Sequence, residues 1–145
     1  MLAAYRALPG DAVTSGGYAQ ELADVARRAL EATVLVAVDG PAMLGCVTFV
    51  PDAANPWAEE LLDGEASIRM LAVDPLAQGR GIGQALVDAC IESARTLERS
   101  AIFLHSTPWM TAAHELYARA GFVRVPERDW LPDPEVPLLG FRLDL

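Results

Sequence analysis

The sequence contains no lysine, so all eleven basic residues are arginines, and twenty Asp and Glu residues bring the formal net charge to −9. An acidic protein repels phosphate backbones, which argues against nucleic-acid binding as the main role. The missing lysine also excludes a P-loop, because that phosphate-binding motif requires one. The acidity is compatible with a cationic substrate, but by itself it speaks mainly to solubility.

Long apolar runs are also missing. No run reaches the roughly eighteen residues that a membrane-spanning helix needs. The N-terminus, MLAAYRALPGDAV, has a short apolar start but no basic stretch followed by a longer apolar one, as a signal peptide would have. We therefore expect a cytoplasmic protein without a membrane partner.

Cysteine and histidine are scarce, with two residues of each. Cys46 and Cys90 both lie among apolar residues, which favours buried free thiols; a disulfide or a reactive pair is the alternative. His105 and His114 do not have the spacing of a metal site. We therefore expect no bound metal.

The length of 145 residues fits one domain, residues 1–145. Apolar spacing predicts helices over 15–31, over about four turns from Ile82, and from Pro108 to Ala120. Apolar and β-branched runs predict strands at 33–38, 43–50, 67–73, 101–105 and 138–145, the last after a proline-rich link over 126–137. A hairpin followed by strand–helix units predicts an α/β domain with a mixed sheet.

The helix predicted over 15–31 is amphipathic. Its apolar residues recur at helical spacing and define an inner face: Tyr18, Leu22, Val25, Ala26, Ala29 and Leu30. Charged residues fall on the other side. We therefore expect Arg27 and Arg28 to face solvent.

Three glycines stand within five positions in the stretch DPLAQGRGIGQAL, residues 74–86. The stretch lies between a predicted strand and a predicted helix. The first turn of a helix has free backbone N–H groups, and glycines let a phosphate approach them closely, while Arg80 adds a positive charge. The arrangement predicts an anion site, with close packing at Gly81 and Gly83 as the alternative. A dinucleotide fingerprint fits from neither possible starting glycine.

The segment Gln78-Gly79-Arg80-Gly81-Ile82-Gly83 matches the Gln/Arg-x-x-Gly-x-Gly/Ala signature of the GNAT superfamily of N-acyltransferases. IRMLAVDP before it resembles that family's fourth strand, and AAHELYARAGF, residues 112–122, resembles its Ala-x-x-Leu-Tyr-x-x-x-Gly-Phe helix. The resemblance covers roughly residues 65–125. It implies a mixed, mostly antiparallel central sheet flanked by helices, which is the GNAT-like acyl-CoA N-acyltransferase fold.

The resemblance implies acetyl-CoA, or a related acyl-CoA, as the acyl donor. Its pyrophosphate would lie on the backbone amides of residues 79–84. Its pantetheine arm would bind the backbone of residues 71–73, on a strand that a bulge splays from its neighbour in the family. The predicted donor-binding residues are Leu71, Ala72, Val73, Gln78, Gly79, Arg80, Gly81, Ile82, Gly83 and Gln84.

The resemblance also implies direct transfer of the acetyl group to a primary amine, on a small molecule or a peptide. Tyr117 is the predicted general acid, because a phenol with a pKa of about 10 can protonate the CoA thiolate; a buried core tyrosine is the alternative. Many relatives begin the strand with Glu where this chain has Ser67, so Glu65, on the same strand face, is the predicted base. The backbone N–H of Leu71 is expected to polarise the thioester carbonyl.

Two departures from the family pattern keep other functions open. Ser67 replaces that glutamate, and Met110 stands where relatives often have an asparagine that contacts the donor. The alternative is a catalytically impaired acyl-CoA-binding module or sensor, and a third reading is a small α/β protein whose glycines only pack. The five acids of residues 51–65 favour a cationic acceptor. The resemblance is also compatible with a homodimer of this chain.

Overall fold

The computed structural model of the chain describes residue 20 and residues 23–145. In that part of the chain, strands β1 to β7 form a seven-stranded sheet in the order β1-β2-β3-β4-β7-β5, with β6 paired to β7. Only β3 and β4 pair in parallel there, so the expected mixed, mostly antiparallel sheet is confirmed. The strands are β1 (Thr33–Asp39), β2 (Ala42–Val50), β3 (Glu65–Val73), β4 (Ala101–Ser106), β5 (Val123–Arg124), β6 (Trp130–Asp133) and β7 (Val136–Asp144).

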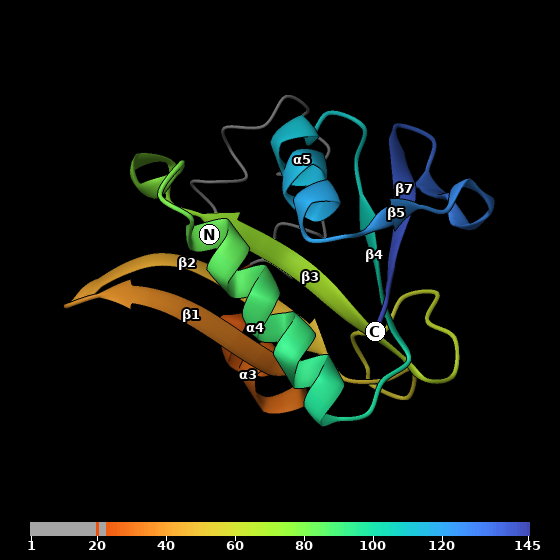
Figure 1. Cartoon of the computed structure of the whole chain (residues 1–145), viewed down its shortest axis with the longest axis horizontal. Coiled ribbons are helices and arrows are strands. Elements are labelled where there is room, and N and C mark those ends of the chain that lie inside the picture. Colours follow the sequence, from red (N-terminus) through yellow and green to blue (C-terminus); the bar gives the residue numbers. More distant parts are fainter. Residues whose placement is uncertain (1–19, 21–22) are drawn as a thin grey trace.

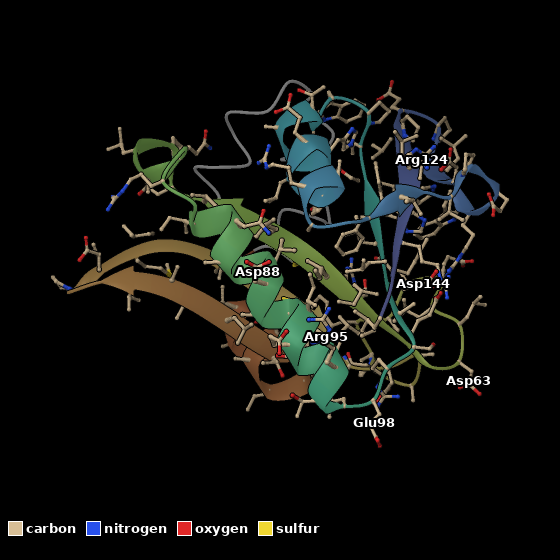
Figure 2. All side chains as sticks on the ribbon, viewed as in Figure 1. Asp63, Asp88, Arg95, Glu98, Arg124 and Asp144 are labelled. Carbon is tan, nitrogen blue, oxygen red and sulfur yellow. The ribbon has the colours of Figure 1, made fainter. Side chains whose placement is uncertain are left out.

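The helices cover both faces of the sheet (Figure 1). They are α3 (Val25–Glu31), α4 (Ile82–Thr96) and α5 (Thr111–Arg119). Helices α4 and α5 pack on one face, around a first apolar cluster that includes Val87, Ile102 and Tyr117. The loop between β2 and β3 packs on the other face, around a second cluster whose buried members are Cys46, Val50, Trp57, Met70 and Ala72. The outer side of α4 carries charged residues such as Asp88 and Arg95 (Figure 2).

A bulge interrupts β3 where it pairs with β2. Thr48 pairs with Arg69 and Cys46 pairs with Ala72, so two residues of β3 lie opposite one residue of β2. Met70, within the bulge, has a φ of +55°. Such an insertion bends a strand and breaks its hydrogen-bond ladder locally. The bulge that the family resemblance implies is therefore present, and it exchanges the faces to which the following side chains point.

Strands β3 and β4 separate after a short stretch of pairing. Their register joins residues 65–67 to residues 101–103 and extends no further. Beyond it, β4 continues along β7 up to Ser106, while β3 turns away towards the start of α4. The gap between the two strands opens towards α5 (Figure 1). The bulge and this divergence together shape the region described below.

The apolar pattern predicts the wrong buried face for the first helix. Arg28 is fully buried, whereas Leu30 is 88% exposed. The rotation of α3 follows from its contacts with the loop after β2: Asn55 Nδ2 donates to the Glu31 backbone oxygen at 2.7 Å, and Trp57 Nε1 donates to the Glu31 carboxylate at 2.9 Å. These polar contacts, which lie outside the helix's own sequence, override its apolar pattern. The start of the predicted helix, including Tyr18 and Leu22, lies outside the described residues.

Two further boundaries differ from the predictions. Helix α5 begins at Thr111 rather than at Pro108, because Met110 N donates to Thr107 O at 3.1 Å and closes a turn before the helix. The link over 126–137 contains β6, which pairs with β7. Pro132 is tolerated in β6 because an edge strand need not donate on its outer side.

The predicted thiols are confirmed: Cys46 and Cys90 are free and buried. Burial raises the pKa of the Cys90 thiol to about 12. None of the helices in residues 23–145 is long and apolar enough to cross a membrane.

Candidate active site

A cleft of about 760 Å³ lies between the end of β3, the glycine-rich turn and α5. From the first two segments it is lined by residues 71–73, 77–79 and 81–84. From α5 and the turn before it come residues 109–113, 115, 116 and 119. The structure therefore brings nine of the ten predicted donor-binding residues to one cleft. The tenth, Arg80, is exposed beside it and lies 3.8 Å from Asp39 in a solvent-exposed ion pair.

Two of the three glycines adopt a backbone conformation that other residues avoid. Gly79 has a φ of +75° and Gly81 a φ of +80°, and a β-carbon on either would meet no atom within 4 Å. Left-handed conformations of this kind cost a residue with a β-carbon about 1–2 kcal/mol. The space that these glycines leave open is available to a ligand.

Gly83 serves packing instead. A β-carbon there would lie 3.2 Å from Leu116 Cδ2 of α5 and 3.7 Å from Val73 Cγ2. The packing alternative from the sequence therefore holds for Gly83, where it brings two helices together, and not for Gly81.

Helix α4 begins at the cleft without a side-chain cap. Gly81 is its N-cap residue, no side chain accepts from the first turn, and that turn contains no acidic residue. The first N–H groups of a helix have no partner within the helix, and the helix dipole adds positive charge at that end. Residues 82–84 therefore offer backbone donors to an anion, as the sequence predicts.

Tyr117 is buried next to the cleft and does not line it. Its ring packs 5.7 Å from Phe122 and 5.9 Å from Phe141, measured between centroids, and 6% of the residue is exposed. Its neighbours Ala113 and Leu116 do line the cleft. Its assignment as general acid stays a prediction.

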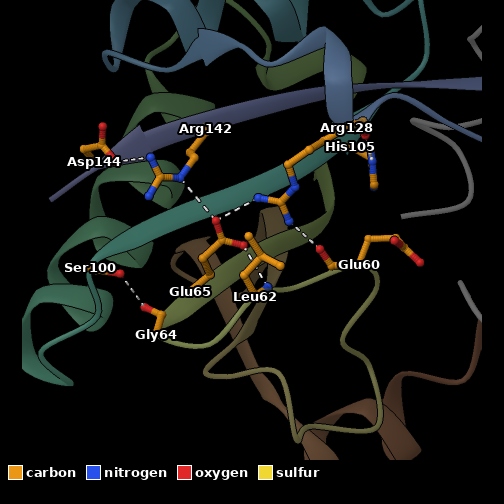
Figure 3. A network of polar contacts seen from close by, with 9 residues as sticks. All are labelled: Glu60, Leu62, Gly64, Glu65, Ser100, His105, Arg128, Arg142 and Asp144. Carbon is orange, nitrogen blue, oxygen red and sulfur yellow. Dashed lines mark hydrogen bonds and ion pairs between the residues drawn. The ribbon is translucent and has the colours of Figure 1, made fainter.

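Glu65 lies at the opposite end of β3 from the cleft. It precedes Leu71 by six positions, or about 20 Å of extended strand. Its Oε1 accepts from Arg128 at 2.8 Å and from Arg142 at 3.2 Å, and its Oε2 accepts from Leu62 N at 3.0 Å (Figure 3). The structure does not bring this predicted base together with the donor-binding residues.

The same contacts make Glu65 a poor proton acceptor. Burial by itself raises the pKa of the Glu65 carboxyl, but hydrogen bonds and positive charge from Arg128, together with the bonds from Leu62 and Arg142, outweigh burial and lower it. Hydrogen bonds to a carboxylate favour its charged form. Glu65 joins β3 to β7 and to the short helical turn Pro126–Arg128.

Two acids of the loop after β2 pair with arginines, and Glu60 and Asp63 are exposed. Glu59 pairs with Arg69, and Asp52 lies 3.7 Å from Arg99. Asp63 is exposed at the end of the molecule away from α5 (Figure 2). None of the acids of residues 51–65 lines the cleft, so the expected cationic acceptor stays a prediction.

Sequence reasoning missed the contribution of α5 and the turn before it. Trp109, Thr111, Glu115 and Arg119 all line the cleft. The spacing of four between Glu115 and Arg119 placed both on one helical face, which was the available signal. In residues 23–145 no group of His, Cys, Asp or Glu is arranged to hold a metal ion.

The segments that line the cleft belong to a part of the chain that resembles known acetyltransferases. The profile of the acetyltransferase (GNAT) family matches residues 4–122. The chain is 36% identical over 70 residues to mycothiol acetyltransferase of Geodermatophilus obscurus, covering 48% of this chain and 23% of that protein. It is 40% identical over 58 residues to amino-acid acetyltransferase of Mycobacterium tuberculosis, covering 40% of this chain and 30% of that protein. The matched stretches thus span less than a third of either relative.

A solved structure extends the likeness to the whole fold. It is a GNAT family acetyltransferase from Elizabethkingia anophelis with acetyl-CoA bound. The two folds superpose with a TM-score of 0.63 at 18% identity, over 87% of this chain and 83% of that chain.

Proposed function

Because this chain belongs to the acetyltransferase (GNAT) family, we propose that it transfers an acetyl group from acetyl-CoA to a primary amine. In this proposal residues 1–145 act as one catalytic domain. The observation that carries it is the meeting of two features in one cleft: the uncapped start of α4 and the bulged end of β3.

The residues of the cleft fit the donor. Open space at Gly79 and Gly81 lets a pyrophosphate approach the N–H groups of the first turn of α4. Arg80, exposed beside the cleft, and Arg119, which lines it, add positive charge to this region. The pairing of β3 with β4 ends at Ser67, so beyond it the strand edge that faces away from β2 is not paired with β4 and can take an extended ligand at residues 72 and 73.

Acetyl-CoA supplies the acetyl group as an activated thioester. The chain holds its carbonyl oxygen at the backbone N–H of Leu71, where negative charge develops. The amine nitrogen forms the new C–N bond as the C–S bond breaks, and the amine gives up one proton. Tyr117 donates one proton to the departing sulfur, so charge and atoms balance.

The proton on the amine needs a separate route. Glu65 is held by two arginines at the far end of β3, so we assign the deprotonation of the amine to solvent. An amine with a pKa near 10 is mostly protonated at neutral pH. The rate at low amine concentration should therefore rise with pH until the free amine predominates.

A module that binds acyl-CoA without catalysis is the second candidate, and the burial of Tyr117 beside the cleft favours it. Two measurements separate the candidates. Titration calorimetry should show that acetyl-CoA binds, and a thiol assay should show CoA release that depends on an added amine. Binding with no amine-dependent release over a broad panel would establish the sensor, and no binding would exclude both.

A further inference from the structure

Arg119, in the last turn of α5, lines the cleft, is exposed, and forms no ion pair with any of the described residues. Glu115, four positions earlier, has the spacing that favours a Glu–Arg pair on a helix, yet these two described side chains do not pair. Arginines elsewhere in the described residues do pair with carboxylates: Arg27, Arg69, Arg80, Arg95, Arg99, Arg124, Arg128 and Arg142. Arg119 therefore presents to the cleft a positive charge that no ion pair compensates.

An arginine without an ion pair calls for an explanation in a chain whose formal net charge is −9. One explanation is local, because a cation in the last turn of a helix interacts favourably with the helix dipole. That role needs no cleft and no ligand. The position of Arg119 relative to the start of α4 supports a second explanation, which is contact with an anionic ligand.

Helix α5 borders the first turn of α4 at Leu116, since a β-carbon on Gly83 would lie 3.2 Å from Leu116 Cδ2. Arg119 follows Leu116 by three positions, which is about 4.5 Å along the helix axis. Both residues line the same cleft, so they lie on the same face of α5. The long side chain of Arg119 can therefore contact a ligand that extends from the start of α4 along α5.

The donor has an anionic group beyond its pyrophosphate. Acetyl-CoA also carries a phosphate monoester on the 3′ oxygen of its adenosine, with a charge of about −1.5 to −2 at neutral pH. In the proposed function the pantetheine arm lies at residues 72 and 73 and the pyrophosphate takes the N–H groups of the first turn of α4. The adenosine then continues from that turn, which α5 borders at Leu116. A guanidinium suits a phosphate because it can donate two parallel hydrogen bonds to it.

We propose that Arg119 binds the 3′-phosphate of the donor and thereby selects CoA and its thioesters over the 3′-dephospho forms. This inference rests on the proposed acetyltransferase function and specifies how its donor is recognised. Arg119 is then a residue of donor specificity, and it takes no part in acetyl transfer.

The test compares two ligands that differ only in the 3′-phosphate. Titration calorimetry measures the Kd of CoA and of 3′-dephospho-CoA for the unmodified protein and for Arg119→Gln. The unmodified protein should bind CoA about tenfold or more tightly, as expected for hydrogen bonds between charged groups. Arg119→Gln should lose that preference by weakening the binding of CoA, while its Kd for 3′-dephospho-CoA should stay the same.

Two further measurements define the contact. Arg119→Lys keeps the charge and loses the paired donors, so it should keep only part of the preference. Added salt should reduce the preference in the unmodified protein, because salt screens exposed charges. With acetyl-CoA as the varied substrate, Arg119→Gln should raise KM far more than it lowers kcat, because the contact lies away from the reacting thioester.

Arg95→Gln is the matched control. It makes the same substitution at an exposed arginine near the end of α4, outside the cleft and paired with Glu92. Both Kd values should stay as they are in the unmodified protein. The melting temperature of Arg119→Gln without ligand tests the local explanation: a role confined to the helix dipole predicts a lower melting temperature and an unchanged preference for CoA.

The outcomes separate this inference from the function on which it rests. Equal affinity of the unmodified protein for CoA and 3′-dephospho-CoA overturns the inference and leaves the acetyltransferase function standing. A preference for CoA that survives in Arg119→Gln also overturns it, and so does a loss of affinity that is equal for the two ligands. If neither CoA nor acetyl-CoA binds the unmodified protein, the acetyltransferase function is overturned and the inference with it.

Discussion

Gly83 in the first turn of α4 faces Leu116 of α5, so that a β-carbon on the glycine would lie 3.2 Å from Leu116 Cδ2. Gly81, two residues earlier, has open space at the same position but a φ of +80°. Neighbouring glycines in one motif are thus required for different physical reasons. Gly83 is required by the packing of α4 against α5, and Gly81 is required by the backbone conformation at the start of α4.

A double-mutant cycle distinguishes these reasons. Gly81→Ala should lower the free energy of unfolding by about 1–2 kcal/mol through backbone strain, and its effect should add to that of Leu116→Val. Gly83→Ala crowds Leu116, and Leu116→Val should relieve part of its cost. Urea unfolding of the single and double variants measures both. An additive cycle for Gly83 and Leu116 would contradict the packing role.

The ion pairs of Glu65 should stabilise the fold rather than serve catalysis. Glu65→Gln removes the buried carboxylate that Arg128 and Arg142 share, and it should cost about 3 kcal/mol, near the low end for breaking a buried pair. Glu92→Gln is the matched control, because the pair of Glu92 with Arg95 is exposed and should contribute only about 0.3 kcal/mol. Denaturant unfolding measures the free energies. A loss of kcat without a loss of stability would restore Glu65 as a base.

The same carboxylate predicts a pH dependence of stability. The folded-state pKa of Glu65 is lowered from 4.5. A lowered pKa means that the carboxylate's contribution is complete above pH 4.5 and is lost as the pH falls through the folded value. Unfolding free energies measured from pH 6 down to pH 3 should therefore fall less steeply in Glu65→Gln than in the unmodified protein. If the two proteins gave parallel curves, the Glu65 carboxyl would not contribute to the pH dependence of the unfolding free energy.

Both thiols should be inert in the folded protein. Burial raises the pKa of Cys46 and raises that of Cys90 to about 12, and only the thiolate reacts readily. An aromatic disulfide reagent at pH 8 should label neither thiol while the protein is folded and both after denaturation. Cys46→Ser should reduce the denatured count from two to one. Rapid labelling of the native protein would contradict the burial.

The sequence predicted which residues come together along one side of the cleft, because those residues are close together in the chain. The turn over residues 78–84 and the strand before it are continuous in the chain, so their pattern carries the geometry. The partners of Glu65 could not be predicted in this way, because Arg128 and Arg142 lie 63 and 77 positions away. The burial of Arg28 was missed for the same reason: contacts of the loop at Asn55 and Trp57 with Glu31 set the rotation of α3. Polar contacts between residues far apart in the chain produce no periodic residue pattern from which they could be predicted.

The hydroxyl of Tyr117 decides between the enzyme and the sensor. Tyr117→Phe keeps the ring between Phe122 and Phe141, so the protein should still fold and should bind acetyl-CoA with the same affinity. Loss of a general acid should lower kcat about 10²-fold to 10⁴-fold. Phe122→Leu is the opposite control, because it should lower stability and spare kcat. An unchanged kcat in Tyr117→Phe would make Tyr117 a core residue, and the proton for the leaving thiolate would then have to come from water in the cleft.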